Sequence, residues 1–161
     1  MPSFNNLKSL YLYIQDQVQD SLKEVSKLIQ EEVKQYIEIN LYNEPTQSYQ
    51  RTRELLESIS VRPISEGGNV IEFEIYYDTT KINPYINNDS IWNAHADIDG
   101  KDVSSLVPLW VEEGTKYPSL YPRKGLGAME NTKNEIENNK FHLVKLQHIL
   151  SSKGINCVIK G

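Results

Sequence analysis

Cysteine is almost absent from this chain of 161 residues, and its scarcity limits the kinds of protein the chain can be. Cys157 is the single cysteine, so the chain cannot carry an internal disulfide framework or a cysteine-based zinc knuckle. A reducing compartment is therefore the expected setting. Cys157 lies in the apolar run 155–159, which we expect to form a terminal strand with the thiol buried.

Long apolar runs and an excess of basic residues are also missing. No stretch of about 18 apolar residues could span a bilayer, and the N-terminus lacks the blocks of a signal peptide. We therefore expect synthesis in the cytoplasm and no membrane partner. The formal net charge is −5, which argues against sequence-independent phosphate binding.

The charge is unevenly distributed along the chain. Residues 1–44 hold 4 basic and 7 acidic residues, residues 45–100 hold 4 and 9, and residues 101–161 hold 9 and 6. Two acidic thirds and one basic third suit a subunit that stacks against copies of itself or against neighbours of opposite charge.

The strongest structural pattern is an amphipathic helix that begins at Leu7. Apolar residues recur every three or four positions as far as Ile37, and neither Pro nor Gly occurs between Ser3 and Asn43. A helix of more than thirty residues would be roughly 50 Å long. We expect one end of it, within 1–44, to project and pack on another chain. The alternative is a two-segment helix bent over its own core.

The rest of the chain, 45–161, predicts a mixed core. A short helix at 50–57 precedes a β-hairpin, in which Ile71, Phe73 and Ile75 alternate along the second strand. A long loop at 78–105, a short helix ending at Gly114 with a left-handed cap, a last helix at 126–153 and the terminal strand follow. The order predicts one α+β domain, with a long N-terminal helix and a C-terminal helix packed on a small, mainly antiparallel sheet.

Each reactive pattern fails on geometry. The acidic run 95–102 lacks the ligands of a calcium loop, and His142 and His148 do not share a helix face. Glu112 and Glu113 would point about 100° apart on a helix, so we interpret them as a polar helix end. Residues 125–127 lack the remainder of a phosphate-binding fingerprint. We therefore expect no catalytic residue, no metal and no cofactor.

Several motifs together resemble one protein family. They are WVEEGT at 110–115, YPSLYPR at 117–123, MENT at 129–132, YQRTRELLES at 49–58, and the segment WNAHAD at 92–97. This set resembles the tail-completion, or head-to-tail joining, proteins of tailed bacteriophages, which are neck proteins. The resemblance covers about residues 49–154, and the longer N-terminal helix departs from it.

The resemblance implies an α+β fold, no catalysis, and a ring of identical subunits, a hexamer, in the neck of the virion. The implied partners are the head connector or stopper and the tail terminator or tail tube, with DNA passing through the lumen without specific binding. Aromatic residues, Arg and a Pro-stiffened arm are typical of interfaces. The candidate interface residues are Trp92, His95, Trp110, Glu113, Gly114, Thr115, Tyr117, Pro118, Tyr121, Pro122 and Arg123.

Two alternatives stay open at this point. One is another ring of the same assembly, such as a tail terminator or stopper. The other is a small enzyme whose site lies in the loop 92–102, with His95 as general base.

Overall fold

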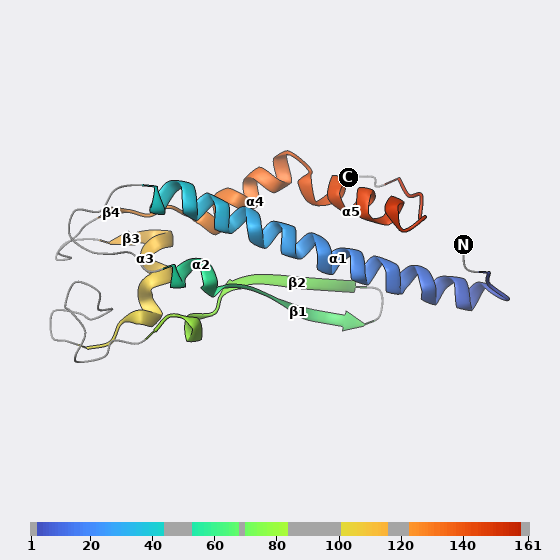
Figure 1. Ribbon diagram of the computed structural model, residues 1–161, viewed down its shortest axis with the longest axis horizontal. Helices are drawn as coiled ribbons and strands as arrows, with labels where there is room; N and C mark the ends of the chain where they lie inside the picture. Colours follow the sequence, from blue (N-terminus) through green and yellow to red (C-terminus); the bar gives the residue numbers. More distant parts are fainter. Residues whose placement is uncertain (1–2, 44–52, 68–69, 84–100, 116–122, 159–161) are drawn as a thin grey trace. The chain divides into compact units, whose positions relative to one another are not determined.

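The chain folds as a mixture of helices and short strands, drawn in Figure 1. The computed structural model describes residues 3–43, 53–67, 70–83, 101–115 and 123–158. The helices are α1 (Leu7–Ile37), α2 (Glu54–Ser58), α3 (Val107–Glu113), α4 (Ala128–Asn138) and α5 (Phe141–Ser152). The strands are β1 (Ile59–Gly67), β2 (Val70–Tyr77), β3 (Gly114–Thr115) and β4 (Arg123–Lys124), and short turns of π-helix (Glu38–Tyr42) and 3-10 helix (Thr79–Lys81 and Ser104–Leu106) complete the set.

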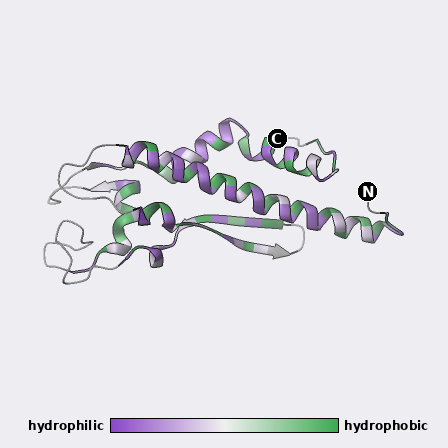
Figure 2. Cartoon of the chain, viewed as in Figure 1, coloured by the Kyte–Doolittle hydropathy of each residue, from purple (hydrophilic) through white to green (hydrophobic). Residues whose placement is uncertain are grey.

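This architecture confirms the predicted α+β class, with a long N-terminal helix, a C-terminal helix and a small antiparallel sheet. β1 pairs with β2, and β3 pairs with β4, in two separate two-stranded sheets. Pro63 is tolerated inside β1 because neither strand of a two-stranded sheet is central. Figure 2 shows the amphipathic pattern of α1 as bands of hydrophobic and hydrophilic colour along the helix.

The chain forms two compact units. One consists of Met1–Ile29, Val61–Glu74 and Lys133–Gly161, and the other of Gln30–Ser60 and Ile75–Thr132. In the first unit, Val25, Ile136 and Leu150 are buried. There, the ammonium of Lys153 donates to the Ser21 hydroxyl at 3.2 Å and pairs with Glu24 at 2.8 Å.

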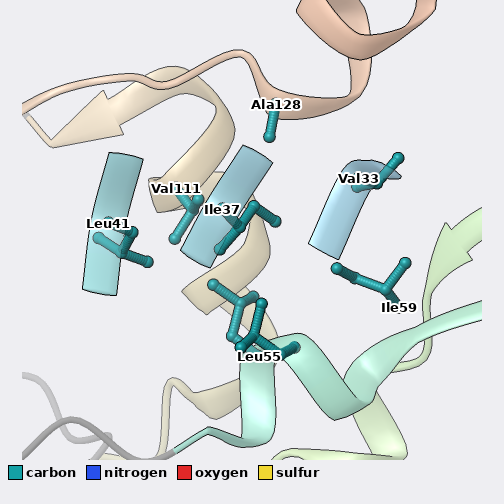
Figure 3. Close-up of a cluster of buried hydrophobic side chains, with 8 residues drawn as sticks. Val33, Ile37, Leu41, Leu55, Ile59, Val111 and Ala128 are labelled. Carbon is teal, nitrogen blue, oxygen red and sulfur yellow. The ribbon is translucent and has the colours of Figure 1, made fainter. Parts of the chain in front are cut away.

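The second unit holds the main hydrophobic cluster, which Figure 3 draws in close-up. Val33 and Ile37 from α1, Leu55 from α2, Val111 from α3 and Ala128 from α4 point toward one another. Leu41, Leu56 and Ile59 complete the cluster. Because α1, α2, α3 and α4 each contribute a side chain, this cluster fixes where the end of α1 meets α2, α3 and the start of α4.

Two predicted helices have other boundaries in the structure. The last helix is not continuous over 126–153, since it breaks between α4 and α5, where Lys140 adopts a left-handed φ of 51°. Two adjacent asparagines, Asn138 and Asn139, precede the break, and asparagine favours turns over helix interiors. The short helix predicted at 50–57 is α2, with Arg53 as its N-cap, and residues 50–52 lie outside the described ranges.

The prediction of a terminal strand was wrong for residues 155–158. They form no strand, and the side-chain amide of Gln147 donates to the Cys157 carbonyl at 3.0 Å. The Cys157 carbonyl therefore accepts its hydrogen bond from a side chain of α5 and not from the backbone of a neighbouring strand. We expected Cys157 to be buried, but it is only half-buried.

Replacing Ile37 by Ala tests the main cluster. Ile37 is 0% exposed, so we expect a loss of about 2–5 kcal/mol in the free energy of unfolding, because the truncation leaves a cavity. Ile39→Ala is the matched control: Ile39 is 52% exposed, and its loss should stay within about 0.5 kcal/mol. Urea unfolding monitored by circular dichroism measures both values, and equal losses in the two variants would contradict this description of the core.

Candidate interaction site

The two ends of the segment 116–122 are held together by a short β-ladder. Gly114 pairs with Lys124 and Thr115 with Arg123, antiparallel, so β3 and β4 bracket this segment. β3 follows α3 directly, and β4 lies four residues before α4. The ladder residues are therefore anchored between the α3 and α4 helices of the same unit.

Gly114 makes the change from helix to strand possible. Its φ of 86° and ψ of 178° belong to a region that only glycine enters readily. The predicted positive φ is confirmed, whereas the expected left-handed helical cap is wrong, because the ψ is extended and leads straight into β3. A side chain at this position would be strained whatever space surrounded it.

Gly125 allows the chain after β4 to pass very close to the end of α3. A Cβ built on Gly125 would lie 2.2 Å from the carbonyl oxygen of Glu112, closer than any real contact. The next two amides use this proximity, since Leu126 donates to the Val111 carbonyl at 2.8 Å and Gly127 to the Glu112 carbonyl at 3.0 Å. The last carbonyls of α3 are thus satisfied by the strand that returns from β4.

The carboxylate of Glu112 connects three elements. It accepts a hydrogen bond from the Tyr77 hydroxyl of β2 at 2.5 Å, and the Met129 amide lies 3.3 Å from each of its oxygens. Met129 is in the first turn of α4, where backbone amides have no helical partner and a negative charge is favoured. Glu112 is partly buried, so it is not the plain polar helix end that we predicted.

The Tyr77 hydroxyl is held in its neutral form by this contact. Burial raises the pKa of Tyr77 well above its usual range, and the hydrogen bond to Glu112 and the negative charge of Glu112 raise it further. A neutral hydroxyl can donate to the carboxylate, whereas a phenolate would repel it. This contact therefore persists over the ordinary pH range.

Asn131 links the end of α1 to the chain that returns from β4. Its side-chain amide lies 2.9 Å from the Tyr36 hydroxyl and 2.7 Å from the Leu126 carbonyl. We call Tyr36, Tyr77, Glu112, Gly125, Met129 and Asn131 the α3–α4 junction. These residues lie far apart in the sequence, and their contacts place both sides of the β3–β4 ladder on one fixed base.

A family model describes most of this chain. The model, named YomN, matches residues 6–152. The chain belongs to the YomN family. The family's name is that of a phage-derived protein, so this YomN-family chain is phage-related. Among curated proteins and among solved structures, none matches the chain.

The YomN-family chain places five of the predicted interface residues in or beside the ladder. Trp110 is partly buried on α3, Glu113 is exposed at its end, Gly114 and Thr115 form β3, and Arg123 begins β4. The remaining predicted residues, Trp92, His95, Tyr117, Pro118, Tyr121 and Pro122, lie outside the described ranges.

Two exposed apolar side chains lie at the N-terminal end of α3. Leu106, the N-cap of α3, and Leu109, in its first turn, both expose more than a third of their surface and are three residues apart. Residues at this spacing lie on one face of a helix. This face is exposed apolar area on the helix that leads into the ladder.

Sequence reasoning missed Tyr77, Glu112 and Gly125 as parts of one site. The available signal was the pair of glycines after Lys124, which indicates a close backbone approach as readily as a phosphate loop. In the residues that the structure describes, no three His, Cys, Asp or Glu side chains gather as a metal site would require. Over the same residues, no helix is long and apolar enough to cross a membrane.

Replacing Tyr77 by Phe tests the junction through its pH dependence. The pKa of Tyr77 is raised by folding, so the unfolded chain loses this proton first, above its ordinary pKa of about 10. The contribution of Tyr77 to the free energy of unfolding is fully present below pH 10. It decreases above pH 10, by up to about 1.4 kcal/mol per pH unit. Urea unfolding between pH 8 and 11 measures the slope.

We expect Tyr77→Phe to remove this part of the alkaline loss and to cost about 1–3 kcal/mol at neutral pH, where a hydrogen bond to a charged group is lost. The matched control is Tyr76→Phe, at the adjacent position on β2 and so on the other face of the strand, which leaves the hydrogen bond between Tyr77 and Glu112 in place. An unchanged slope in Tyr77→Phe would refute the pairing with Glu112.

Proposed function

We propose that this phage-related chain is a structural, non-enzymatic ring subunit of a virion neck. In this role it is a tail-completion protein that joins the tail to the head connector, and the ring is a hexamer. It is made in the cytoplasm of the host bacterium and resides in the assembled particle. The observation that carries the proposal is the β3–β4 ladder on the α3–α4 junction, which pairs the residues on either side of the segment 116–122.

The composition of that segment supports an adhesive role. Tyr117 and Tyr121 are of the type that supplies most binding energy at interfaces, and each can contribute about 2 kcal/mol or more when centrally buried. Pro118 and Pro122 restrict the backbone, so less chain entropy is lost on docking. A segment of this kind binds best when its ends are already placed, as the ladder places them.

The chemistry of Glu112 supports the absence of catalysis. A general base needs a carboxylate or imidazole available to a substrate proton. The Glu112 carboxylate already accepts from the Tyr77 hydroxyl and faces the first turn of α4. Its role is to hold elements of the chain together.

The charges support the proposed setting. A ring subunit presents two different surfaces to its two neighbours, and the acidic first two thirds and basic last third of this chain can meet across each boundary. The net charge of −5 also suits a lumen through which DNA passes without binding, because like charges repel.

Co-expression with connector and tail proteins tests the proposal. We expect rings in negative stain and a ring mass in native mass spectrometry. Leu109→Asp should lower the assembled fraction at least tenfold, because a charge enters the exposed apolar face of Leu106 and Leu109. Val144→Asp is the control, since Val144 is also an exposed apolar residue on a short helix, and it should assemble as the wild type does.

A chain that stays monomeric with both partners present would overturn the proposal. His95→Ala separates it from the enzyme alternative. The variant assembles normally if the chain is a ring subunit, whereas loss of a measurable activity with assembly intact would favour an enzyme. Rings found on the tail tube without the connector would instead identify a tail terminator.

A further inference from the structure

The first turns of α1 form a defined helix. The Asn6 side chain accepts from the Ser9 amide at 2.8 Å, and the Ser9 hydroxyl donates to the Asn6 carbonyl at 2.8 Å. This is the contact of a helix N-cap. Phe4 folds back against Tyr13, with ring centroids 5.0 Å apart. The helix therefore begins at a fixed place, and one side of its start is covered by its own chain.

Another side of the same turns is apolar and exposed. Leu7, Tyr11 and Ile14, which we call the N-terminal stripe, expose 84%, 56% and 39% of their surfaces. Their spacing of four and three residues places them on one helix face. Six of the eight residues from Leu7 to Ile14 are apolar, and a helix that is hydrophobic over most of its circumference is normally buried.

The stripe continues a face that is covered further along α1. At the same spacing, Val18, Ser21 and Val25 follow; Val18 is half-buried, and Ser21 and Val25 are buried. Lys153, directly after α5, contacts α1 at Ser21 and Glu24. The contacts from the end of α5 thus reach α1 two turns beyond Ile14, and the N-terminal stripe lies on the earlier turns.

The charge of the first turns of α1 favours a second neutral, apolar helix start as the partner of the N-terminal stripe. Between Leu7 and Val18 the charged residues are Lys8 and Asp16, so the segment is neutral while the whole chain carries −5. Nucleic acid or an anionic lipid surface would need a basic helix. A strongly charged protein surface would find little to pair with here, whereas a second apolar, neutral helix start meets no repulsion.

Leu12 provides the second face that such a contact needs. It is 48% exposed and lies about 100° around the helix from Tyr11. In a closed ring each subunit meets its two neighbours through different surfaces. The stripe can face one neighbour while Leu12 faces the other.

We propose that the N-terminal stripe receives the Leu12 face of α1 from a second copy of this chain. The inference rests on the proposed ring for its partner and adds the surface by which the copies meet. Three short turns bury less area than the roughly 1,200 Å² of a stable interface. The contact is therefore weak between two free chains and strengthens when a ring supplies it at every boundary.

Ile14→Lys tests the surface in the ring assay. We expect at least a tenfold loss of assembled rings, because each boundary would bury an unpaired ammonium. The matched control is Gln35→Lys, which adds the same charge at an exposed position of the same helix and should assemble normally. Circular dichroism of both variants checks that α1 is intact.

Disulfide trapping in a Cys157→Ser background tests the pairing of faces. A mixture of Tyr11→Cys and Leu12→Cys chains should cross-link at least tenfold more than either chain alone. Rings that form equally well with Ile14→Lys, or cross-links that are as strong in Tyr11→Cys alone, would overturn this inference and leave the proposed ring standing. Binding of the stripe to neutral vesicles in place of a second copy would likewise overturn this inference alone, whereas wild-type chains that never associate would overturn both.

Discussion

The carboxylate of Glu112 lies between the Tyr77 hydroxyl and the first turn of α4, and the geometry around the β3–β4 ladder depends on it. The charge is stabilised by the Tyr77 hydroxyl of β2 and by the Met129 amide at the start of α4. Gly125 then allows the returning chain to approach the end of α3. Without these contacts, the apolar cluster would still gather α1, α2 and α3, but the ladder would have no fixed base.

Anchoring the ladder lowers the conformational entropy that would be lost on binding. A segment whose ends are held by paired strands loses less entropy on docking than a free loop of equal length. The start of α1 has the same property, because its N-cap and the contact between Phe4 and Tyr13 define it before any partner arrives. The proposed subunit would thus meet its neighbours through two pre-organised elements, one in each compact unit.

The sequence predicted the elements with strong periodicity and missed those set by distant contacts. The spacing of apolar residues located α1, and the alternation at Ile71, Phe73 and Ile75 located β2. The junction could not be predicted, because Tyr77 and Glu112 are 35 residues apart and no local pattern relates them. The terminal strand was also wrong, since residues 155–158 form no strand and the Cys157 carbonyl accepts instead from the side chain of Gln147.

Amide hydrogen exchange tests most directly whether Glu112 holds the junction. In Glu112→Ala we expect the amides of Leu126, Gly127 and Met129 to exchange at least tenfold faster than in the wild type. The amide of Asn43, bonded to Glu38, should be unaffected. Glu113→Ala, which removes the exposed neighbouring carboxylate, should leave all four amides protected. Unchanged protection of Met129 in Glu112→Ala would contradict the account.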